Sequence, residues 1–189
     1  MALAAVIVTA PGVALADATF SATLDASTTQ EARIGRDGTP STCGTAKTYP
    51  GQLGSGPRAY DSYSVVNNSG SPQCYTVTLS SAAGSELIAV AYLGTFNPAA
   101  IGAGYLGDAG ASDTTRTFGV DVPAGATLTV VITDVNDAAG GQAYTLDIAG
   151  QMEPAPPPIP TLSEWAMILF GGLLAGGAAL GLQRRRVLG

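Results

Sequence analysis

The sequence predicts an all-β protein built around a single β-sandwich. Three observations support this prediction: apolar and polar residues alternate over short segments, turn-forming residues separate these segments, and no amphipathic helical pattern occurs before Gly150. Seven or eight short strands of this kind can bury their apolar faces when two sheets pack on each other. We therefore expect residues 17–150 to form one sandwich with jelly-roll or Greek-key-like connections.

The alternation has a period of two residues in three segments, CYTVTLS (74–80), TLTVVITD (127–134) and AYTLDIAG (143–150). This period places the apolar side chains of each segment on one face of a strand and leaves the other face to water. Two longer apolar runs, ELIAVAYL (86–93) and YSVV (63–66), are typical of strands buried deeper between two sheets. The strand order is not encoded in these patterns.

Turn-forming residues stand between the predicted strands, in NNSGSP (67–72), GDAGASD (107–113), PAGA (123–126) and NDAAGG (136–141). Gly accepts positive φ, Pro presets φ, and Asn or Asp bonds its own backbone, so each cluster favours a tight connection. Asn67 also begins an N-glycosylation sequon, but the segment is foremost a turn.

The first sixteen residues predict a secretory signal peptide. An apolar run from Ala2 to Val8 precedes Ala14 and Ala16, which have the spacing of a cleavage site after Ala16. No Lys or Arg precedes Arg33, so either the natural start lies upstream or this signal departs from the usual basic beginning. The alternative interpretation is a buried first strand.

The residues after 150 predict a stalk and a membrane anchor. The Pro-rich linker, residues 151–160, has few backbone donors for a sheet and favours an extended conformation. Residues 165–182 carry no charge and, at about 1.5 Å per residue, are long enough to cross roughly 27 Å of hydrocarbon as one transmembrane helix. A buried core helix is the alternative, but the sequence offers no partner helix to cover it.

A basic cluster follows the apolar segment: Arg184, Arg185 and Arg186. Arginines at one end of a membrane helix indicate the cytoplasmic side. We therefore expect residues 17–150 to lie beyond the inner membrane.

A recognisable motif connects the linker to the apolar segment. It comprises Ile159, Pro160, Thr161, Leu162 and Trp165. Followed by the apolar segment and the arginines, this motif resembles the IPTL-CTERM sorting signal of bacterial surface proteins over residues 159–186. The resemblance implies that an exosortase-type enzyme in the inner membrane recognises and processes the exported precursor. Ala166 stands where that family usually has Gly, and a plain tail anchor is the alternative.

A second resemblance covers residues 33–150. Its strings are RDG (36–38), YDSYSV (60–65), YLGTFNP (92–98), YLGD (105–108) and PAG (123–125). They are similar to those of a β-rich extracellular module found in secreted bacterial surface proteins. This resemblance implies a display or interaction role, with no activity attached to particular residues.

Cys43 and Cys74 are the two cysteines of the chain. A bridge between them closes a loop of about thirty residues and stabilises an exported domain by roughly 3–4 kcal/mol in the chain-entropy treatment. We therefore expect a disulfide. A nucleophilic cysteine is the rival interpretation, but the chain contains no His to activate it.

Charge and composition narrow the functional classes. Of the 14 acidic and 8 basic residues, 13 and 5 lie between Asp17 and Pro160, a formal charge of −8 that repels nucleic acid. The absence of His removes the usual general base and the commonest metal ligand. We therefore expect no enzymatic activity; a secreted hydrolase that uses a pair of carboxylates is the second alternative.

Two loops carry the hard oxygen ligands that calcium accepts, Asp108 and Asp113 in one, and Asp134, Asn136 and Asp137 in the other. Their spacing differs from that of an EF-hand, and turn formation by Asp and Asn explains them equally well. We expect no other cofactor.

Two further groups of side chains have alternative interpretations. We expect either a surface ion pair near a turn or a contact with an acidic glycan from three charged residues, Arg33, Arg36 and Asp37. Four tyrosines offer either stacking on sugars or packing at the core and its rim: Tyr49, Tyr60, Tyr63 and Tyr105.

These observations predict an exported bacterial surface protein with a structural or adhesive role. We expect a membrane-anchored precursor and a mature form at the cell surface or in the extracellular matrix. The first alternative is a surface module that binds a polysaccharide or calcium.

Overall fold

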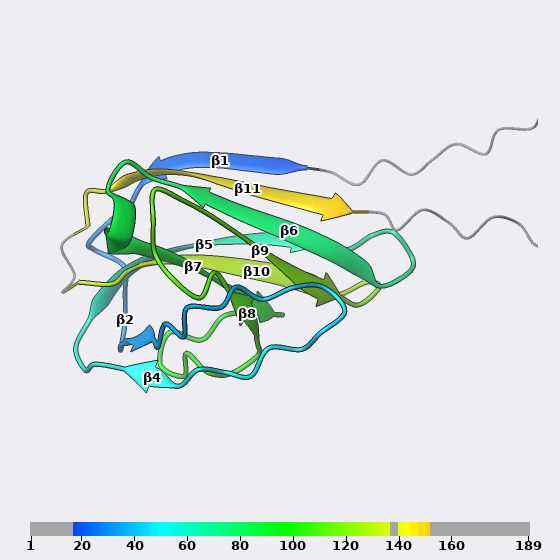
Figure 1. Ribbon diagram of the computed structural model, residues 1–189, viewed down its shortest axis with the longest axis horizontal. Coiled ribbons are helices and arrows are strands. Elements are labelled where there is room, and N and C mark those ends of the chain that lie inside the picture. The colour runs from blue at the N-terminus through cyan, green and yellow to red at the C-terminus, as the bar shows by residue number, and fades with distance from the viewer. Residues whose placement is uncertain (1–16, 137–139, 152–189) are drawn as a thin grey trace, which may run out of the picture. The chain divides into compact units, whose positions relative to one another are not determined.

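The computed structural model describes residues 17–136 and 140–151, and this part of the chain is almost entirely β-structure (Figure 1). The elements are β1 (Ala18–Thr23), β2 (Thr29–Gln30), β3 (Arg33–Ile34), β4 (Gln52–Leu53), β5 (Arg58–Val66), β6 (Gln73–Ser80), the 3-10 helix η1 (Gly84–Glu86), β7 (Leu87–Leu93), β8 (Tyr105–Asp108), β9 (Thr115–Val122), β10 (Thr127–Asp134) and β11 (Ala143–Gln151). No helix in these two ranges is long and apolar enough to span a membrane. The predicted signal peptide, the linker beyond Gln151 and the apolar segment 165–182 lie outside the described residues.

Nine of the strands form two antiparallel sheets with jelly-roll connections. One sheet has the order β1-β11-β6-β9 and the other the order β2-β5-β10-β7-β8. Apart from the two-residue strands β2, β3 and β4, the first strand pairs with the last, β5 with β10, β6 with β9, and β7 with β8. In Figure 1, β1, β11 and β6 lie together above β5, β10 and β7. This nested pairing confirms the predicted jelly-roll sandwich.

The core between the two sheets consists of the alternating residues that the sequence predicts. Val77 and Leu79 of β6 face Leu128 and Val130 of β10 within one hydrophobic cluster, and none of the four is more than 3% exposed. Leu146 of β11 belongs to the same cluster. Each strand turns every second side chain inward, so the period of two follows directly from burial on one face.

The outer face of the five-stranded sheet is buried over β7 and the adjoining part of β10. Ile88, Val90 and Tyr92 of β7 pack in a second hydrophobic cluster with residues from connecting segments, among them Ile34 and Ile101. The chain's own connections therefore cover this part of the face. The expectation that the run 86–93 is buried between two sheets is correct for only alternate residues, because the others serve this second cluster.

The run YSVV at 63–66 is a wrong prediction of deep burial. Tyr63 and Val65 pack against the inter-sheet core, but Ser64 points outward and Val66 is 48% exposed. The second hydrophobic cluster reaches β5 at Tyr60, so the later outward residues of this strand lack that cover.

The turn after β5 depends on Asn67, which is fully buried. Its Nδ2 donates to the carbonyl oxygens of Ser71, Val122 and Pro123 at 2.8, 2.9 and 3.1 Å. Its Oδ1 accepts the backbone N–H and the hydroxyl of Ser69. The side chain thus joins two loops at one end of the sandwich, as expected of a turn residue, and its amide is occupied within the fold.

Candidate functional site

The two cysteines form the predicted disulfide. The Cys43–Cys74 bond joins residues 31 positions apart and connects the segment before β4 to the start of β6. The backbone N–H of Gly44 donates to Asp121 of β9 at 2.6 Å, beside the bridge. The bond therefore holds part of a long connection against the four-stranded sheet, which is a structural role.

Asp37 and Asp108 are both bound to Lys47. The Lys47 ammonium donates to Asp37 at 2.9 Å, to Asp108 at 3.0 Å and to the carbonyl of Thr39. The Asp108 side chain is fully buried, and that of Lys47 is 9% exposed. The hydrogen bond from Lys47 holds the pKa of Asp37 below its ordinary value. Asp37 therefore forms an ion pair with Lys47, whereas Arg33 or Arg36 was the partner expected from the sequence.

Asp108 accepts two further hydrogen bonds, from the hydroxyl of Tyr105 and from the backbone N–H of Gly110. Burial, followed by the hydrogen bond to Asp108, raises the pKa of Tyr105 well above its ordinary value. Three donors therefore compensate the buried carboxylate, as an ionised group without water requires. We call Lys47, Asp37, Asp108 and Tyr105 the lysine latch.

The strings RDG and YLGD meet at the lysine latch and mark positions that the fold constrains. Gly38 has φ +81° and donates to the carbonyl of Gly110 at 2.9 Å. A Cβ on Gly107 would lie 2.7 Å from the Cβ of Ser41 and 2.8 Å from a methyl carbon of Val120. These motif residues therefore support the fold rather than line a ligand site.

The tyrosines considered for sugar stacking pack against other rings. Tyr49 meets Tyr105 edge-on at 5.2 Å, and Tyr60 meets Phe96 at the same distance. Tyr63 lies 4.3 Å from Phe20 and shares a 2.7 Å hydrogen bond with the Tyr144 hydroxyl. Packing at the core and its rim is therefore the interpretation that the contacts support.

The candidate calcium ligands have separate roles in the described structure. Asp113 forms an exposed ion pair with Arg116 at 3.3 Å. Asp134 accepts the backbone N–H of Asn136 at 2.7 Å and the amide of Gln142 at 3.3 Å. Asp137 lies outside the described residues. No group of three or more acidic or cysteine side chains suited to a metal occurs within residues 17–136 and 140–151.

The outer face of the four-stranded sheet carries hydroxyl groups in register. One row consists of Thr19, Asp147, Thr78 and Thr117, and the next of Ser21, Thr145, Ser80 and Thr115. All eight residues are exposed or partly exposed. We call this surface the hydroxyl face.

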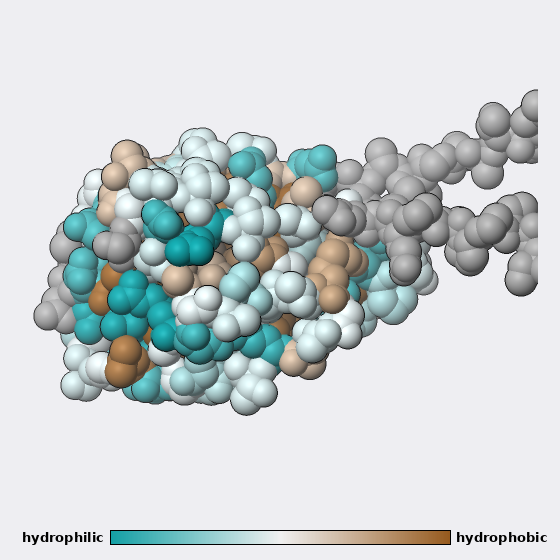
Figure 2. All heavy atoms as spheres, in the orientation of Figure 1, coloured by the Kyte–Doolittle hydropathy of each residue, from teal (hydrophilic) through white to brown (hydrophobic). Residues whose placement is uncertain are grey.

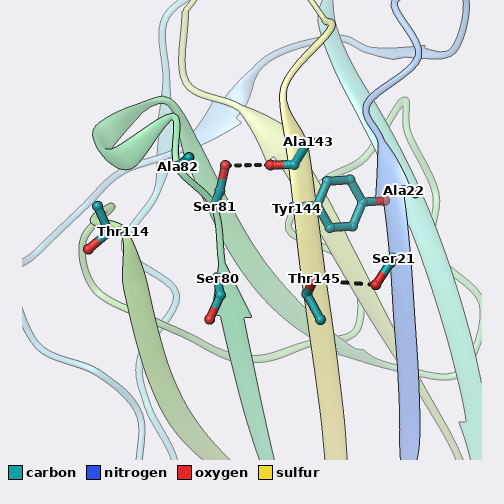
Figure 3. A pocket seen from close by; sticks show the side chains of 9 residues that line it. All are labelled: Ser21, Ala22, Ser80, Ser81, Ala82, Thr114, Ala143, Tyr144 and Thr145. Carbon is teal, nitrogen blue, oxygen red and sulfur yellow. Dashed lines mark hydrogen bonds between the residues drawn. The ribbon is translucent and has the colours of Figure 1, made fainter.

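A shallow groove of about 550 Å³ lies at one end of the hydroxyl face. Figure 3 shows Ser80, Thr145 and Ser21 on the adjacent strands β6, β11 and β1, where the last two share a 3.3 Å hydrogen bond. The Ser81 hydroxyl donates to the carbonyl of Ala143 at 2.7 Å. Small apolar side chains and hydroxyls together form a lining that can accept a polar ligand with an apolar flank.

The hydroxyl face has no large apolar side chain exposed on it. The exposed large apolar residues of the described chain are Leu53, Val66 and Leu93, all on strands outside the four-stranded sheet. The side of the molecule that Figure 2 shows is mostly pale or teal, with scattered brown patches. An apolar partner therefore finds little contact area on this sheet.

Sequence reasoning did not identify the hydroxyl face. The polar positions of single strands, such as Thr76 and Thr78, are visible as alternation, but the order of strands is needed to combine them into one surface. The sorting motif and the basic cluster, in contrast, are visible in sequence and lie outside the described residues.

Comparison with known proteins supports the C-terminal assignment. Residues 157–186 match the IPTL-CTERM motif, which confirms the resemblance noted in the sequence. The chain matches no curated protein. Among solved structures it is similar to CBM35 from Cellvibrio japonicus Abf62, at 19% identity and a TM-score of 0.29, over 70% of this chain and 95% of that chain. A likeness at this TM-score carries no argument about function.

Proposed function

We propose that this chain, which carries the IPTL-CTERM motif at residues 157–186, is an exported surface protein whose jelly-roll domain is displayed beyond the inner membrane. The motif match is the observation that carries the proposal. An exosortase-type enzyme in the membrane recognises the segment that begins at Ile159, and the precursor is held there until it is processed. The disulfide supports export, because such bonds persist in oxidising compartments.

The displayed domain has a structural or adhesive role rather than an enzymatic one. Asp108 is compensated by three donors, and Asp61 accepts the Tyr144 hydroxyl at 2.6 Å. Carboxylates engaged in this way hold the fold together and are poorly placed to act on a substrate. Screening the purified chain against glycoside and peptide substrates tests this point, and turnover abolished by a single Asp→Asn substitution would establish the hydrolase alternative.

The sorting proposal is tested by mass spectrometry of the C-terminal peptide in surface material. We expect the wild-type surface form to lack LQRRRVLG and a Leu162→Asp variant to keep it and accumulate in the membrane fraction. Ser163→Ala is the matched control, because Ser163 lies next to Leu162 and is not one of Ile159, Pro160, Thr161, Leu162 and Trp165. Intact LQRRRVLG in surface material, both with and without the processing enzyme, would leave only the plain tail anchor.

A further inference from the structure

Most of the outer face of the four-stranded sheet stays open, whereas the outer face of the other sheet is covered over β7 and β10. Connecting segments bury Ile88, Val90 and Tyr92 on the five-stranded sheet. No such layer lies over Thr78 or Thr145 within residues 17–136 and 140–151, and both side chains remain partly exposed. The jelly roll is therefore complete without a cover over most of this face.

Hydrogen bonds on the hydroxyl face leave a central strip between β11 and β6. Thr78 bonds Thr117 at 2.9 Å and Ser80 bonds Thr115 at 3.3 Å, on the β6–β9 side. On the β1–β11 side, Thr19 donates to Asp147 at 2.7 Å and Ser21 shares a bond with Thr145 at 3.3 Å.

Across β11 and β6, the side chains of Thr145 and Ser80 share no hydrogen bond, and neither do those of Asp147 and Thr78. Thr145 lies opposite Ser80 and Asp147 opposite Thr78 in the register of the two strands. A hydroxyl has one donor and two acceptor positions, so each keeps hydrogen-bonding capacity after its first bond. We call the outward surface shared by β11 and β6 the central strip.

The central strip is long enough for a stretch of an extended chain. Seven register pairs join β11 and β6, and Cys74 of the last pair carries the disulfide to Cys43. The five pairs from Thr145–Ser80 to Ala149–Thr76 span roughly 14 Å at about 3.4 Å per residue. Ala149 lies on the strip opposite Thr76, and Gly119 of β9 next to them is covered by Cys43, whose backbone nitrogen would lie 3.1 Å from a Cβ at that position. A single small molecule would occupy only part of this length.

The charge of the face selects the ligand. Asp147 and Asp121 are the ionisable side chains on the outward positions of the four strands within the described residues, and both accept hydrogen bonds. The formal charge of −8 between residues 17 and 160 repels polyanions. An uncharged chain rich in hydroxyl groups avoids this repulsion and supplies both donors and acceptors.

We propose that the central strip of the hydroxyl face binds an uncharged, extended polysaccharide. Ser80, Thr145 and Thr78 provide hydrogen bonds, and the groove beside Ala143 receives part of one sugar ring. The strip has no aromatic platform, so each sugar contributes little and affinity accumulates along the polymer. This inference rests on the proposed display outside the cell, since an extracellular glycan reaches the face only there.

The test uses the full chain in a sugar-free zwitterionic detergent, titrated with soluble mixed-linkage β-glucan and with dextran, and with alginate as an acidic polymer. We expect binding to at least one of the two uncharged polymers and none to alginate. The triple variant Thr78→Val/Ser80→Ala/Thr145→Val is expected to lose at least about ten-fold in affinity, because it removes three polar contacts while keeping β-compatible side chains. Ala143→Arg is expected to weaken binding by filling the groove.

The matched control is Ser62→Ala/Thr48→Val, which removes two exposed hydroxyls away from the four-stranded sheet. We expect its affinity to stay within about two-fold of wild type, and circular dichroism melting reports whether each variant is folded. Absence of binding to both uncharged polymers, preference for alginate, or equal losses in the triple variant and the control would each overturn the inference. A chain that binds glucan but is never sorted to the surface would instead contradict the proposed function.

Discussion

On the five-stranded sheet the outer face is buried over β7 and β10 under other segments of the chain, whereas on the four-stranded sheet most of it stays open and carries rows of hydroxyl groups. The central strands show the difference in sequence. LIAVAYL of β7 is apolar at every position because both of its faces are buried. Apolar and polar residues alternate in YTVTL of β6 because only one face of this strand is buried. Burial of one outer face therefore contributes to the stability of the fold, whereas the other outer face remains accessible to solvent and to other molecules.

The largest expected effect is on the covered face. Tyr92→Ala removes a ring that is 1% exposed and lies 4.8 Å from the ring of Phe96. We expect the free energy of unfolding to fall by about 3–5 kcal/mol, measured by urea denaturation of the full chain, because a large cavity opens under the connections. A loss below about 1 kcal/mol would show that the covering layer is loosely packed and that the two faces differ less than proposed.

Reduction of the disulfide tests how strongly it holds the connection between β3 and β4, which contains Cys43. The Cys43–Cys74 bond constrains a loop of 31 positions, and its loss is expected to lower the free energy of unfolding by about 3–4 kcal/mol. The measurement is urea denaturation with and without reductant. The Cys43→Ser/Cys74→Ser variant is the control, and its free energy of unfolding should be the same with and without reductant. An unchanged wild type under reducing conditions would mean that other contacts suffice to hold the segment.

The lysine latch supports the same segment through charge. Lys47→Met leaves the buried Asp108 carboxylate with Tyr105 and Gly110 as donors, and we expect a loss of about 3 kcal/mol, since an uncompensated buried charge is costly. The double variant Lys47→Met/Asp108→Asn should recover part of this loss, because it also removes the charge. Losses that simply add would show that Lys47 and Asp108 do not act together.

The sequence predicts the sandwich, its alternating core strands and the disulfide because each of these depends on local spacing or on residue type alone. Its burial prediction for YSVV was wrong because the cover over β5 comes from segments distant in the chain. The hydroxyl face could not be predicted for the same reason. Only the jelly-roll pairing of the strands shows that Thr78 and Thr145 lie on one surface. The IPTL segment needed no tertiary information, since it is read as a linear motif.

Alkaline pH is expected to weaken the buried aromatic regions and to leave the hydroxyl face unchanged. Burial raises the pKa of Tyr92, Tyr105 and Tyr144 above the ordinary value of 10.0. Their protonated forms therefore contribute stability that is fully present below pH 10 and is lost as the pH rises toward the higher pKa of the folded state. Urea denaturation across this range, followed with tyrosinate absorbance, should show the fall beginning near pH 10. A flat profile would contradict the burial of these rings.

The smallest expected effect comes from exchanging a hydroxyl and a methyl group on the two outer faces. Thr78→Val on the hydroxyl face gives up one exposed hydrogen bond to Thr117 and keeps a β-branched side chain, so the free energy of unfolding should change by less than about 0.5 kcal/mol. The reverse change, Val131→Thr, puts a hydroxyl into the buried second cluster and should cost about 1–3 kcal/mol. Urea denaturation of both variants compares nearly isosteric substitutions on opposite sheets. If Thr78→Val were as costly as Val131→Thr, the hydroxyl rows would be needed for folding, and their availability to a polysaccharide would lose its physical basis.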